Sequence, residues 1–475
     1  MGACVAALLL WGAFFPGWGP LAWIALVPLL WVLDGAGPRR GAVLGALFGV
    51  AFFLLEFSSL LSLSAFVGGL IVPAWLLLSL YAALFCLVFG LVGGWRSSPV
   101  AWAGAWVLLE AARGAGPLGF TFGSIPGALV GSPFLRAAAV GGPWLLSLAV
   151  AWTGACLARG LRDGRWLPLA ALGPGVLLAL SFIPAGTQPL GTLRVALVQP
   201  NIPKLEQLDG GKVAERENLY RELLAQLSPR VDLVAVPENA LPWLLDNPGS
   251  LALFQEGAGR LNARLVVGTG VFRDGDVYNT VLVLSPAGEI LGSYAKTRLV
   301  PFGEYVPGRG IWEGIGLGWI LDAALPYDQT PGEAVVPVGD LGIMICFEST
   351  LPGVARALVR GGARVLLTPT NDAWFGRTRL LWEHYALGAL RAAETGRSFV
   401  QVGQTGISGA WDHRGDEIER LPPWTRGTVV LEVPLRTGLT PYVRAGDGPV
   451  LGLAGALVVV LMAKRPRSGR GRGGR

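Results

Sequence analysis

Long apolar runs alternate with short polar turns over the first 185 residues, and one further apolar run stands near the C-terminal end. Several of these runs approach the roughly 20 residues that an α-helix needs to cross a bilayer. The pattern predicts a polytopic α-helical membrane bundle of about eight spans. The runs cover residues 3–15, 20–33, 41–60, 72–94, 98–112, 135–158, 166–183 and 448–463. A turn from Pro16 to Pro20 predicts two short helices at the start, although a single span over 1–33 fits the charges equally well.

The charged residues divide the chain in the same places as the apolar runs. Hydrophobic residues make up 52% of the chain and charged residues 15%, a composition too apolar for an ordinary water-soluble enzyme. Only four of the 32 acidic side chains precede residue 185, and all the others lie before residue 448. We therefore expect a membrane bundle of seven spans over 1–185, a soluble domain over 186–447, a final span over 448–463 and a basic cytoplasmic tail over 464–475.

Basic residues mark alternate loops of the predicted bundle. Arg39 and Arg40, then Arg96, then three arginines between 159 and 165, and finally the C-terminal tail carry the positive charge. By the positive-inside rule these segments are cytoplasmic, which places the soluble domain on the extracytoplasmic face. The excess of basic over acidic residues therefore indicates the orientation in the membrane and gives no support for binding to nucleic acid.

Two acidic residues, Glu56 and Glu110, lie within apolar runs. Ionised groups are expensive in lipid and are functional candidates when they lie deep in it. Both lie close to the end of a run, and Arg113 stands one turn after Glu110. We therefore expect both to have structural roles.

The soluble part alternates β-rich runs with helical stretches, which predicts a layered α/β domain. The predicted strands cover 193–199, 231–236, 264–268, 277–284, 341–346 and 364–367, and the predicted helices include 211–227, 351–361 and 380–395.

Three polar residues of this domain stand after predicted strands or in Pro-bounded loops, where α/β sheets usually place active sites. Glu238 lies in V-P-E-N-A-L-P, Lys296 in Y-A-K-T-R-L-V-P-F-G-E-Y-V-P, and Cys346 in G-I-M-I-C-F-E-S-T. Taken singly, each has an ordinary alternative as a solvated charge or a core cysteine. Their joint occurrence, with Cys346 the one cysteine of the soluble part, favours a catalytic site.

The three segments resemble the Glu-Lys-Cys triad motifs of the nitrilase, or carbon-nitrogen hydrolase, superfamily. Together with the bundle, and with N-D-A-W-F-G at 371–376, nearly the whole chain resembles the apolipoprotein N-acyltransferases. The resemblance implies a nitrilase-like αββα sandwich for the soluble domain. It also implies a multi-pass protein of the bacterial cytoplasmic (inner) membrane.

The resemblance further implies an acyltransferase. Cys346 would take an acyl group from a phospholipid as a thioester, and would pass it to the free α-amino group of the diacylglyceryl-cysteine that begins an apolipoprotein. No cofactor is required, and with two histidines and no C-x-x-C pair the sequence predicts no metal site. We expect the enzyme to act as a monomer, without nucleic acid.

The roles of the triad follow from the chemistry of a thiol. A cysteine with a pKa near 8.5 is mostly protonated at neutral pH, so a base is needed for fast acyl transfer. Glu238 is the candidate general base for the thiol and later for the attacking amine. Lys296 and the backbone N–H of Phe347 are the candidate donors to the oxyanion.

Three further polar residues are candidates for support. Glu304 and Glu348 would orient the lysine and the base and balance their charges, unless they are ordinary surface carboxylates. Asn371 follows the predicted strand that ends near Thr368 and would border the pocket.

Three aromatic residues are candidates for a lid that dips into lipid, with core packing as the alternative. They are Trp243, Trp374 and Phe375.

This chain departs from the family pattern at three places. Gln207 and Leu208 stand where relatives have a Lys-Trp pair, Phe347 stands where tyrosine is common, and Gln404 replaces a more usual asparagine. None of these changes touches the triad, so they affect substrate fit more than reaction type.

Two other functions remain open on the sequence. A membrane-tethered amidase of the nitrilase type would resolve the same thioester with water, and the number of spans argues against it. A transporter or sensor with an external binding domain would not need the triad, and it would need ionisable groups deep in the spans.

Overall fold

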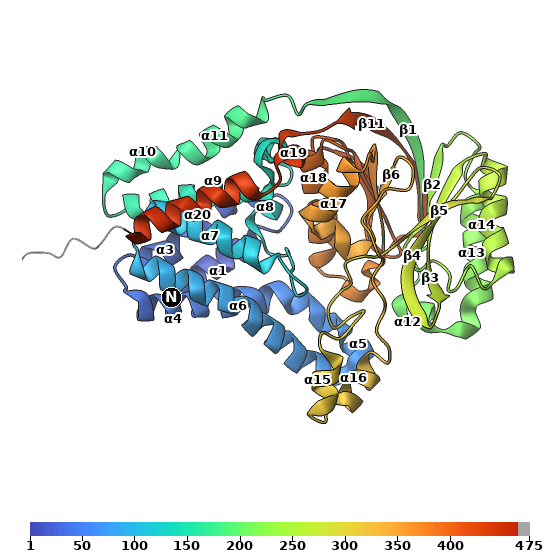
Figure 1. Cartoon of the computed structure of the whole chain (residues 1–475), viewed down its shortest axis with the longest axis horizontal. Helices are drawn as coiled ribbons and strands as arrows, with labels where there is room; N and C mark the ends of the chain where they lie inside the picture. Colours follow the sequence, from blue (N-terminus) through green and yellow to red (C-terminus); the bar gives the residue numbers. More distant parts are fainter. Residues whose placement is uncertain (464–475) are drawn as a thin grey trace, which may run out of the picture.

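The computed structural model describes residues 1–463 and consists of a helical bundle joined to an α/β domain (Figure 1). The tail predicted for 464–475 lies outside the described residues. Each predicted apolar run is helical. The helices are α1 (Gly2–Gly12), α2 (Ala22–Ala25), α3 (Val27–Leu33), α4 (Pro38–Glu56), α6 (Ile71–Trp95), α7 (Pro99–Arg113), α9 (Ala138–Gly160), α10 (Leu167–Ala170), α11 (Leu172–Ser181) and α20 (Gly448–Ala463).

Among residues 1–463, four helical segments are long and apolar enough to cross a membrane: Pro38–Phe66, Gly68–Trp95, Pro133–Gly160 and Gly164–Ser181. Shorter apolar segments cover Gly2–Gly12, Gly19–Leu33 and Gly448–Val459. The prediction of eight spans therefore stays a prediction. The start of the chain does form two helices, because α1 ends at Gly12 and a turn leads into α2 and α3.

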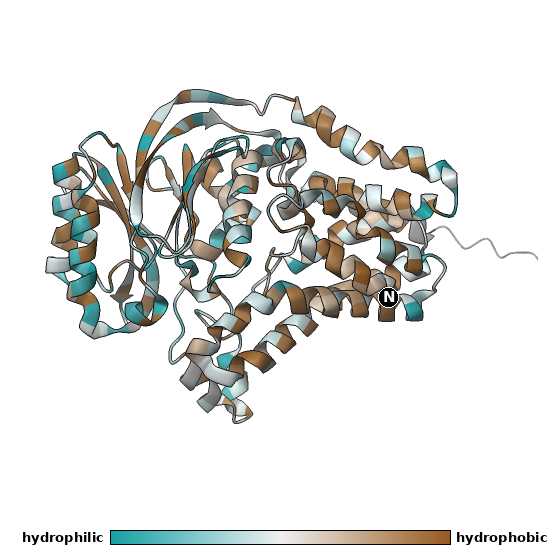
Figure 2. Ribbon diagram, turned by 180° about the vertical axis from the view of Figure 1, so that it is seen from behind, coloured by the Kyte–Doolittle hydropathy of each residue, from teal (hydrophilic) through white to brown (hydrophobic). Residues whose placement is uncertain are grey.

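The helices of the bundle are rich in hydrophobic residues, as Figure 2 shows by their brown colour. On α6, Leu77 and Leu84 are 66% and 56% exposed. A helix that presents leucines outward as well as inward is typical of a lipid-facing position. The bundle therefore has the surface that a bilayer requires.

Helices α4 and α6 lie close together because small residues face each other along both. A Cβ atom at Gly45 of α4 would overlap the carbonyl oxygen of Cys86 in α6, and one at Gly41 would overlap that of Gly90. Small residues four positions apart allow two backbones this approach, which van der Waals packing then stabilises.

We expect Gly45→Leu to lower the free energy of unfolding by at least about 1–3 kcal/mol, because the new side chain would force α4 and α6 apart. Gly175 on α11 has nothing within 4 Å of an added Cβ, so Gly175→Leu is the matched control. Thermal unfolding of both detergent-solubilised variants checks this. Equal midpoints would contradict the close packing.

The α/β domain contains two sheets that pack face to face. The first has the strand order β11-β1-β2-β3-β4-β5 and the second β10-β9-β8-β7-β6. The strands of the first are β1 (Thr187–Gln199), β2 (Leu233–Ala235), β3 (Arg264–Arg273), β4 (Asp276–Leu284), β5 (Ile290–Ala295) and β11 (Gly427–Gly438). Those of the second are β6 (Leu341–Ile343), β7 (Val365–Thr370), β8 (Phe399–Gly403), β9 (Ser408–Trp411) and β10 (Glu417–Leu421).

Helices cover the outer face of each sheet, which gives the αββα sandwich. Residues such as Val195 and Val266 of the first sheet meet Ile343 and Val400 of the second in one buried core. Helices α13 (Val213–Ala225) and α14 (Pro248–Leu261) form a second core on the first sheet. Helices α17 (Pro352–Arg360) and α18 (Leu380–Thr395) cover the second sheet, and their apolar residues belong to the same core as the bundle.

The first and last strands of the α/β domain, β1 and β11, pair with each other and connect the domain to the bundle. The first residues of β1 lie opposite the last residues of β11, with Thr187 beside Gly438, so the chain leaves α11 and returns to α20 at one place (Figure 1). The predicted layered α/β class is confirmed. The predicted strand over 341–346 is too long, because β6 ends at Ile343 and the backbone then turns at Cys346.

Candidate active site

The three predicted triad residues come from both sheets. Glu238 follows β2 and Lys296 follows β5, which belong to the first sheet, whereas Cys346 follows β6 of the second. Each of the three residues therefore lies just beyond the carboxyl end of a strand.

Lys296 lies within a cluster of buried polar groups. Its Nζ is 2.7 Å from Oε1 of Glu304 and 3.5 Å from Oε1 of Glu238, and only 1% of its side chain is exposed. The Nδ2 of Asn279 donates to both carboxylates, at 2.7 Å to Glu238 and 3.2 Å to Glu304. Burial opposes the charged lysine, but Glu304 and Glu238 outweigh it and raise the pKa of Lys296. The cluster therefore holds a permanent positive charge.

Cys346 occupies a strained turn. Its φ is +50°, in the left-handed region, which costs a residue other than glycine about 1–3 kcal/mol. The thiol has a pKa well above its usual value, mainly because of burial and also because of Glu238, while Lys296 acts in the opposite direction. A hydrogen bond with the side chain of Thr370 also favours the thiolate. The thiol of Cys346 is therefore neutral at rest.

Glu348 connects the turn of Cys346 to the loop of Lys296. Its Oε2 accepts from the N–H of Ile345 at 2.9 Å, on one side of Cys346. Its Oε1 accepts from the N–H and hydroxyl of Thr297, at 2.8 and 2.7 Å, and from the hydroxyl of Tyr294 at 2.9 Å. Burial raises the pKa of Glu348, and the hydrogen bonds oppose this. The nucleophile and the lysine are thus held in fixed relation by one carboxylate.

The other residues predicted for support lie close to this cluster. Phe347 is the residue directly after the nucleophile and packs partly buried against the core that the bundle shares. Asn371 is buried, and its Nδ2 donates to Oε1 of Gln207 at 2.6 Å. The side chain of Leu208 lies outside the described part of the chain.

Two of the predicted lid residues lie where the domain meets the bundle. The ring of Trp374 is 5.2 Å from that of Phe66, and its carbonyl accepts from the hydroxyl of Ser62 at 3.0 Å. The ammonium of Lys204 lies 4.2 Å over the same ring. Phe375 packs against the ring of Phe122 in the bundle core. Both therefore have neighbours from the helical part of the chain.

Trp243 lies in a different environment. It is 38% exposed, and the ring lies beside Gly270 on β3, where an added Cβ would be 3.1 Å away. The described contacts do not join it to Trp374 or Phe375.

Glu56, one of the two acidic residues within the apolar runs, belongs to an ion cluster where the bundle meets the α/β domain. Arg379, just before α18, donates to Glu56 of α4 at 2.5 Å and to Glu383 at 2.7 Å. Its guanidinium also lies over the rings of Trp11 and Phe14. All three charged side chains are buried, so this cluster fastens α18 to the bundle.

The other membrane acid, Glu110, organises the loop after α7. It accepts from the N–H of Ile125 at 2.8 Å and from the hydroxyl of Ser147 at 2.5 Å. Arg113 donates to the carbonyls of Phe120 and Phe122 in the same loop. The structural role expected for both acids is supported by these contacts.

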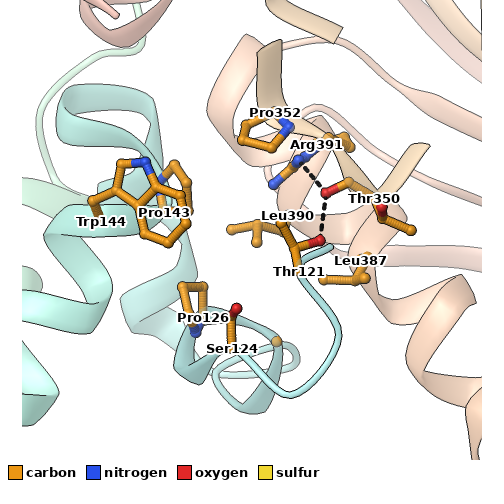
Figure 3. Close-up of a pocket in the computed structure, with 11 residues that line it drawn as sticks. Thr121, Ser124, Pro126, Pro143, Trp144, Thr350, Pro352, Leu387, Leu390 and Arg391 are labelled. Carbon is orange, nitrogen blue, oxygen red and sulfur yellow. Dashed lines mark hydrogen bonds between the residues drawn. The ribbon is translucent and has the colours of Figure 1, made fainter. Parts of the chain in front are cut away.

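A small pocket lies between this loop and the α/β domain (Figure 3). On its wall the hydroxyl of Thr121 and the guanidinium of Arg391 both donate to the carbonyl of Thr350, at 2.9 and 3.0 Å. Thr350 ends the 3₁₀ turn η7 (Cys346–Thr350) that begins at the nucleophile. The bundle therefore contacts the catalytic turn directly.

Sequence reasoning missed several residues of the site. Asn279 bridges the two carboxylates, and Asp372 and His384 lie behind the nucleophile. Asp372 is part of the N-D-A-W-F-G segment, and His384 is one of two histidines in the chain. These features of the sequence could have marked both residues as candidates. Asn279 lies within the predicted strand 277–284, and no motif marks it in the sequence.

The sandwich, with a glutamate, a lysine and a cysteine at its strand ends, defines a protein of the carbon-nitrogen hydrolase class. Residues 194–440 match the family model described as Carbon-nitrogen hydrolase, and residues 6–156 match that of the Apolipoprotein N-acyltransferase N-terminal domain. The chain is 32% identical to the apolipoprotein N-acyltransferase of Azotobacter vinelandii, over 94% of this chain and 91% of that protein. It is 31% identical to that of Geobacter metallireducens, over 95% and 92%. The chain belongs to the apolipoprotein N-acyltransferase family.

Two solved structures are similar to part of this chain. A carbon-nitrogen hydrolase from Helicobacter pylori G27 covers 58% of this chain and 96% of its own, with 17% identity and a TM-score of 0.39. An amidase from Nesterenkonia sp. covers 55% and 95%, with 18% identity and a TM-score of 0.38.

The raised pKa of Cys346 predicts slow alkylation at neutral pH. We expect the rate of reaction with iodoacetamide to rise continuously up to pH 9, because the thiolate fraction stays small below the pKa. Glu238→Gln removes a carboxylate that raises this pKa. The alkylation rate of this variant should therefore reach half of its maximum at a lower pH than that of the wild type. Intact mass gives the rates, and Cys346→Ala corrects for the other cysteines. A plateau for the wild type below pH 8 would contradict the raised pKa.

Proposed function

We propose that this protein transfers an acyl group from a membrane phospholipid to the α-amino group of the diacylglyceryl-cysteine at the start of an apolipoprotein. The buried cluster of Glu238, Lys296 and Glu304 beside the thiol of Cys346 is the observation that carries the proposal. Membership of the family favours an amine over water as the acceptor, so N-acylation is preferred to the amidase alternative.

The first half-reaction forms a thioester. Glu238 accepts the proton of the Cys346 thiol as the sulfur attacks the ester carbonyl of the phospholipid. Negative charge develops on the carbonyl oxygen, where the ammonium of Lys296 and the N–H of Phe347 stabilise it. The ester C–O bond then breaks, and the departing oxygen takes the proton from Glu238 to give a lysophospholipid.

The second half-reaction transfers the acyl group. The neutral α-amino group attacks the thioester carbonyl, and Glu238 accepts one of its protons. The same donors stabilise the second oxyanion. The C–S bond breaks, Cys346 regains a proton from Glu238, and an amide is released. No other group is needed, because each proton that leaves a nucleophile is returned to a leaving group.

Glu304 and Glu348 support these steps without reacting. Glu304 pairs with Lys296 at 2.7 Å, and Glu238 lies further from the same ammonium, at 3.5 Å. Glu348 keeps the loop of Lys296 beside the turn of Cys346. Asn371 borders the pocket through its contact with Gln207. Trp374 and Phe375 form the side of the pocket nearest the bundle, and Trp243 contacts lipid from the sandwich.

We assign the protein to the bacterial inner membrane as a multi-pass enzyme with eight spans. Seven lie in 1–185 and one in 448–463, the catalytic domain over 186–447 is extracytoplasmic, and the tail over 464–475 is cytoplasmic. The alternating basic loops and the apolar bundle surface support this topology. It places a site for two lipid substrates beside the bilayer that supplies them.

Purified protein incubated with phospholipid should gain one acyl mass, which a diacylated cysteinyl peptide should then remove as it becomes N-acylated. Intact mass spectrometry follows both steps. Cys346→Ala should gain no mass, and Glu238→Gln should acquire the adduct at least about 100-fold more slowly, as expected for loss of a general base. An adduct that water removes without peptide product would contradict the transferase, and its absence with every phospholipid would contradict the thioester.

The topology predicts that Asp274, in the turn between β3 and β4, faces the outside of the cell. A cysteine placed there by Asp274→Cys should react with a membrane-impermeant maleimide in intact spheroplasts. A cysteine placed by Arg39→Cys should react only after lysis. The reverse pattern would contradict the proposed orientation.

A further inference from the structure

A buried histidine–aspartate pair lies directly behind the nucleophile. Nδ1 of His384 on α18 is 2.8 Å from Oδ1 of Asp372, and both side chains are almost fully buried. Nε2 of His384 is 3.1 Å from the carbonyl oxygen of Cys346 and 2.9 Å from the hydroxyl of Ser349. The proposed half-reactions give this pair no role.

The surroundings of the pair favour a charged histidine. Oδ1 of Asp372 also accepts from the hydroxyl of Thr370 at 2.8 Å, and its Oδ2 has no hydrogen-bond partner among the described residues. A buried carboxylate with so few donors requires a neighbouring positive charge. Burial opposes the imidazolium, but Asp372 and the carbonyl of Cys346 outweigh it and raise the pKa of His384. Both ring nitrogens then carry hydrogen, and the one on Nε2 points at the Cys346 carbonyl and Ser349.

The carbonyl that His384 contacts belongs to the peptide group that ends in the N–H of Phe347. Resonance couples the two ends of a peptide group. A hydrogen bond to the oxygen therefore makes the N–H more positive and a stronger donor, as in other chains of hydrogen bonds. Because this peptide is trans, its N–H points away from His384.

Two contacts hold the same carbonyl in position. The hydroxyl of Ser349 donates to it at 2.8 Å, in addition to the contact with His384. The left-handed backbone of Cys346 needs such contacts to persist. His384 is itself fixed from the bundle side, because its neighbour Glu383 binds Arg379 and the N–H of Gly123.

We propose that Asp372 and His384 are positioning residues that hold the peptide between Cys346 and Phe347 and polarise it, so that the N–H of Phe347 binds the oxyanion more strongly. The proposal rests on the proposed acyl transfer. On this proposal, the pair speeds acylation, which forms an oxyanion at a carbonyl carbon. It has little effect on reactions of the thiol that form no oxyanion.

The charged groups around His384 are few. Asp372 faces it from η8 (Asp372–Phe375), the carbonyl of Cys346 faces it from η7, and Glu238 acts on it from the first sheet. Arg379 and Glu383 lie on or beside its own helix. The rings of Phe122 and Phe375, at 6.2 and 6.3 Å, exclude water from the remaining sides.

The test compares two reactions of the full-length protein in detergent. One is formation of the acyl-enzyme from phospholipid, and the other is alkylation of Cys346 by iodoacetamide, which forms no oxyanion. His384→Gln keeps an N–H but loses the charge. We expect it to acylate about tenfold more slowly at an unchanged half-saturating lipid concentration, while alkylation changes by less than about threefold. His413→Gln, at the other histidine, should match the wild type in both.

The pH dependence gives a second readout. In Asp372→Asn the pKa of His384 should fall, since the carboxylate that raises it is gone and burial remains. The acylation rate of this variant relative to wild type should therefore decrease as pH rises from 5.5 to 8. The ratio should be independent of pH when His384→Gln is compared with the double variant His384→Gln/Asp372→Asn.

The outcomes separate this inference from the proposed function. Absence of an acyl-enzyme in the wild type would overturn the proposed function and this inference with it. A wild-type adduct together with equal losses of acylation and alkylation in His384→Gln, or with no loss of either, would overturn the inference alone. If Asp372→Asn fails to fold, the comparison of the two reactions in His384→Gln decides the matter.

Discussion

Lys296 carries a positive charge into a position where only 1% of its side chain is exposed. A buried charge without partners costs several kcal/mol, and the two carboxylates beside Lys296 offset that cost. Glu238, Asn279 and Lys296 come from or directly follow β2, β4 and β5, and Glu304 lies in the loop beyond. The site therefore exists only when the first sheet has its complete strand order.

The second sheet adds the nucleophile, and Glu348 joins the two parts. Its carboxylate binds Ile345 on one side of Cys346 and Thr297, next to Lys296, on the other. Five hydrogen bonds to one buried carboxylate fix two loops that belong to different sheets. The distance between thiol and lysine is thus set by a residue that takes no part in the reaction.

The bundle contributes to the site as well as to membrane attachment. In this chain α18 has the bundle on its outer side, fastened by the ion cluster of Glu56, Arg379 and Glu383. The next residue along the helix is His384, which reaches the carbonyl of Cys346. The catalytic turn also contacts Thr121 in the loop after α7. Movements of the bundle and the geometry of the nucleophile are therefore physically connected.

The sequence alone determined the apolar helices and several strands, because composition and periodicity are local properties. It also placed Glu238, Lys296 and Cys346 in motifs whose chemistry is recognisable. It did not indicate the strands β5, β8, β9, β10 and β11 or the helix α14; β11, for example, pairs with β1 at the other end of the domain. Neither the contact of Asn279 with the two carboxylates nor that of His384 with Cys346 leaves a local pattern. The pairing of Glu56 with Arg379 joins residues 323 positions apart. Only the tertiary structure decided such contacts, because buried charges and polar groups find their partners through the packing of whole elements.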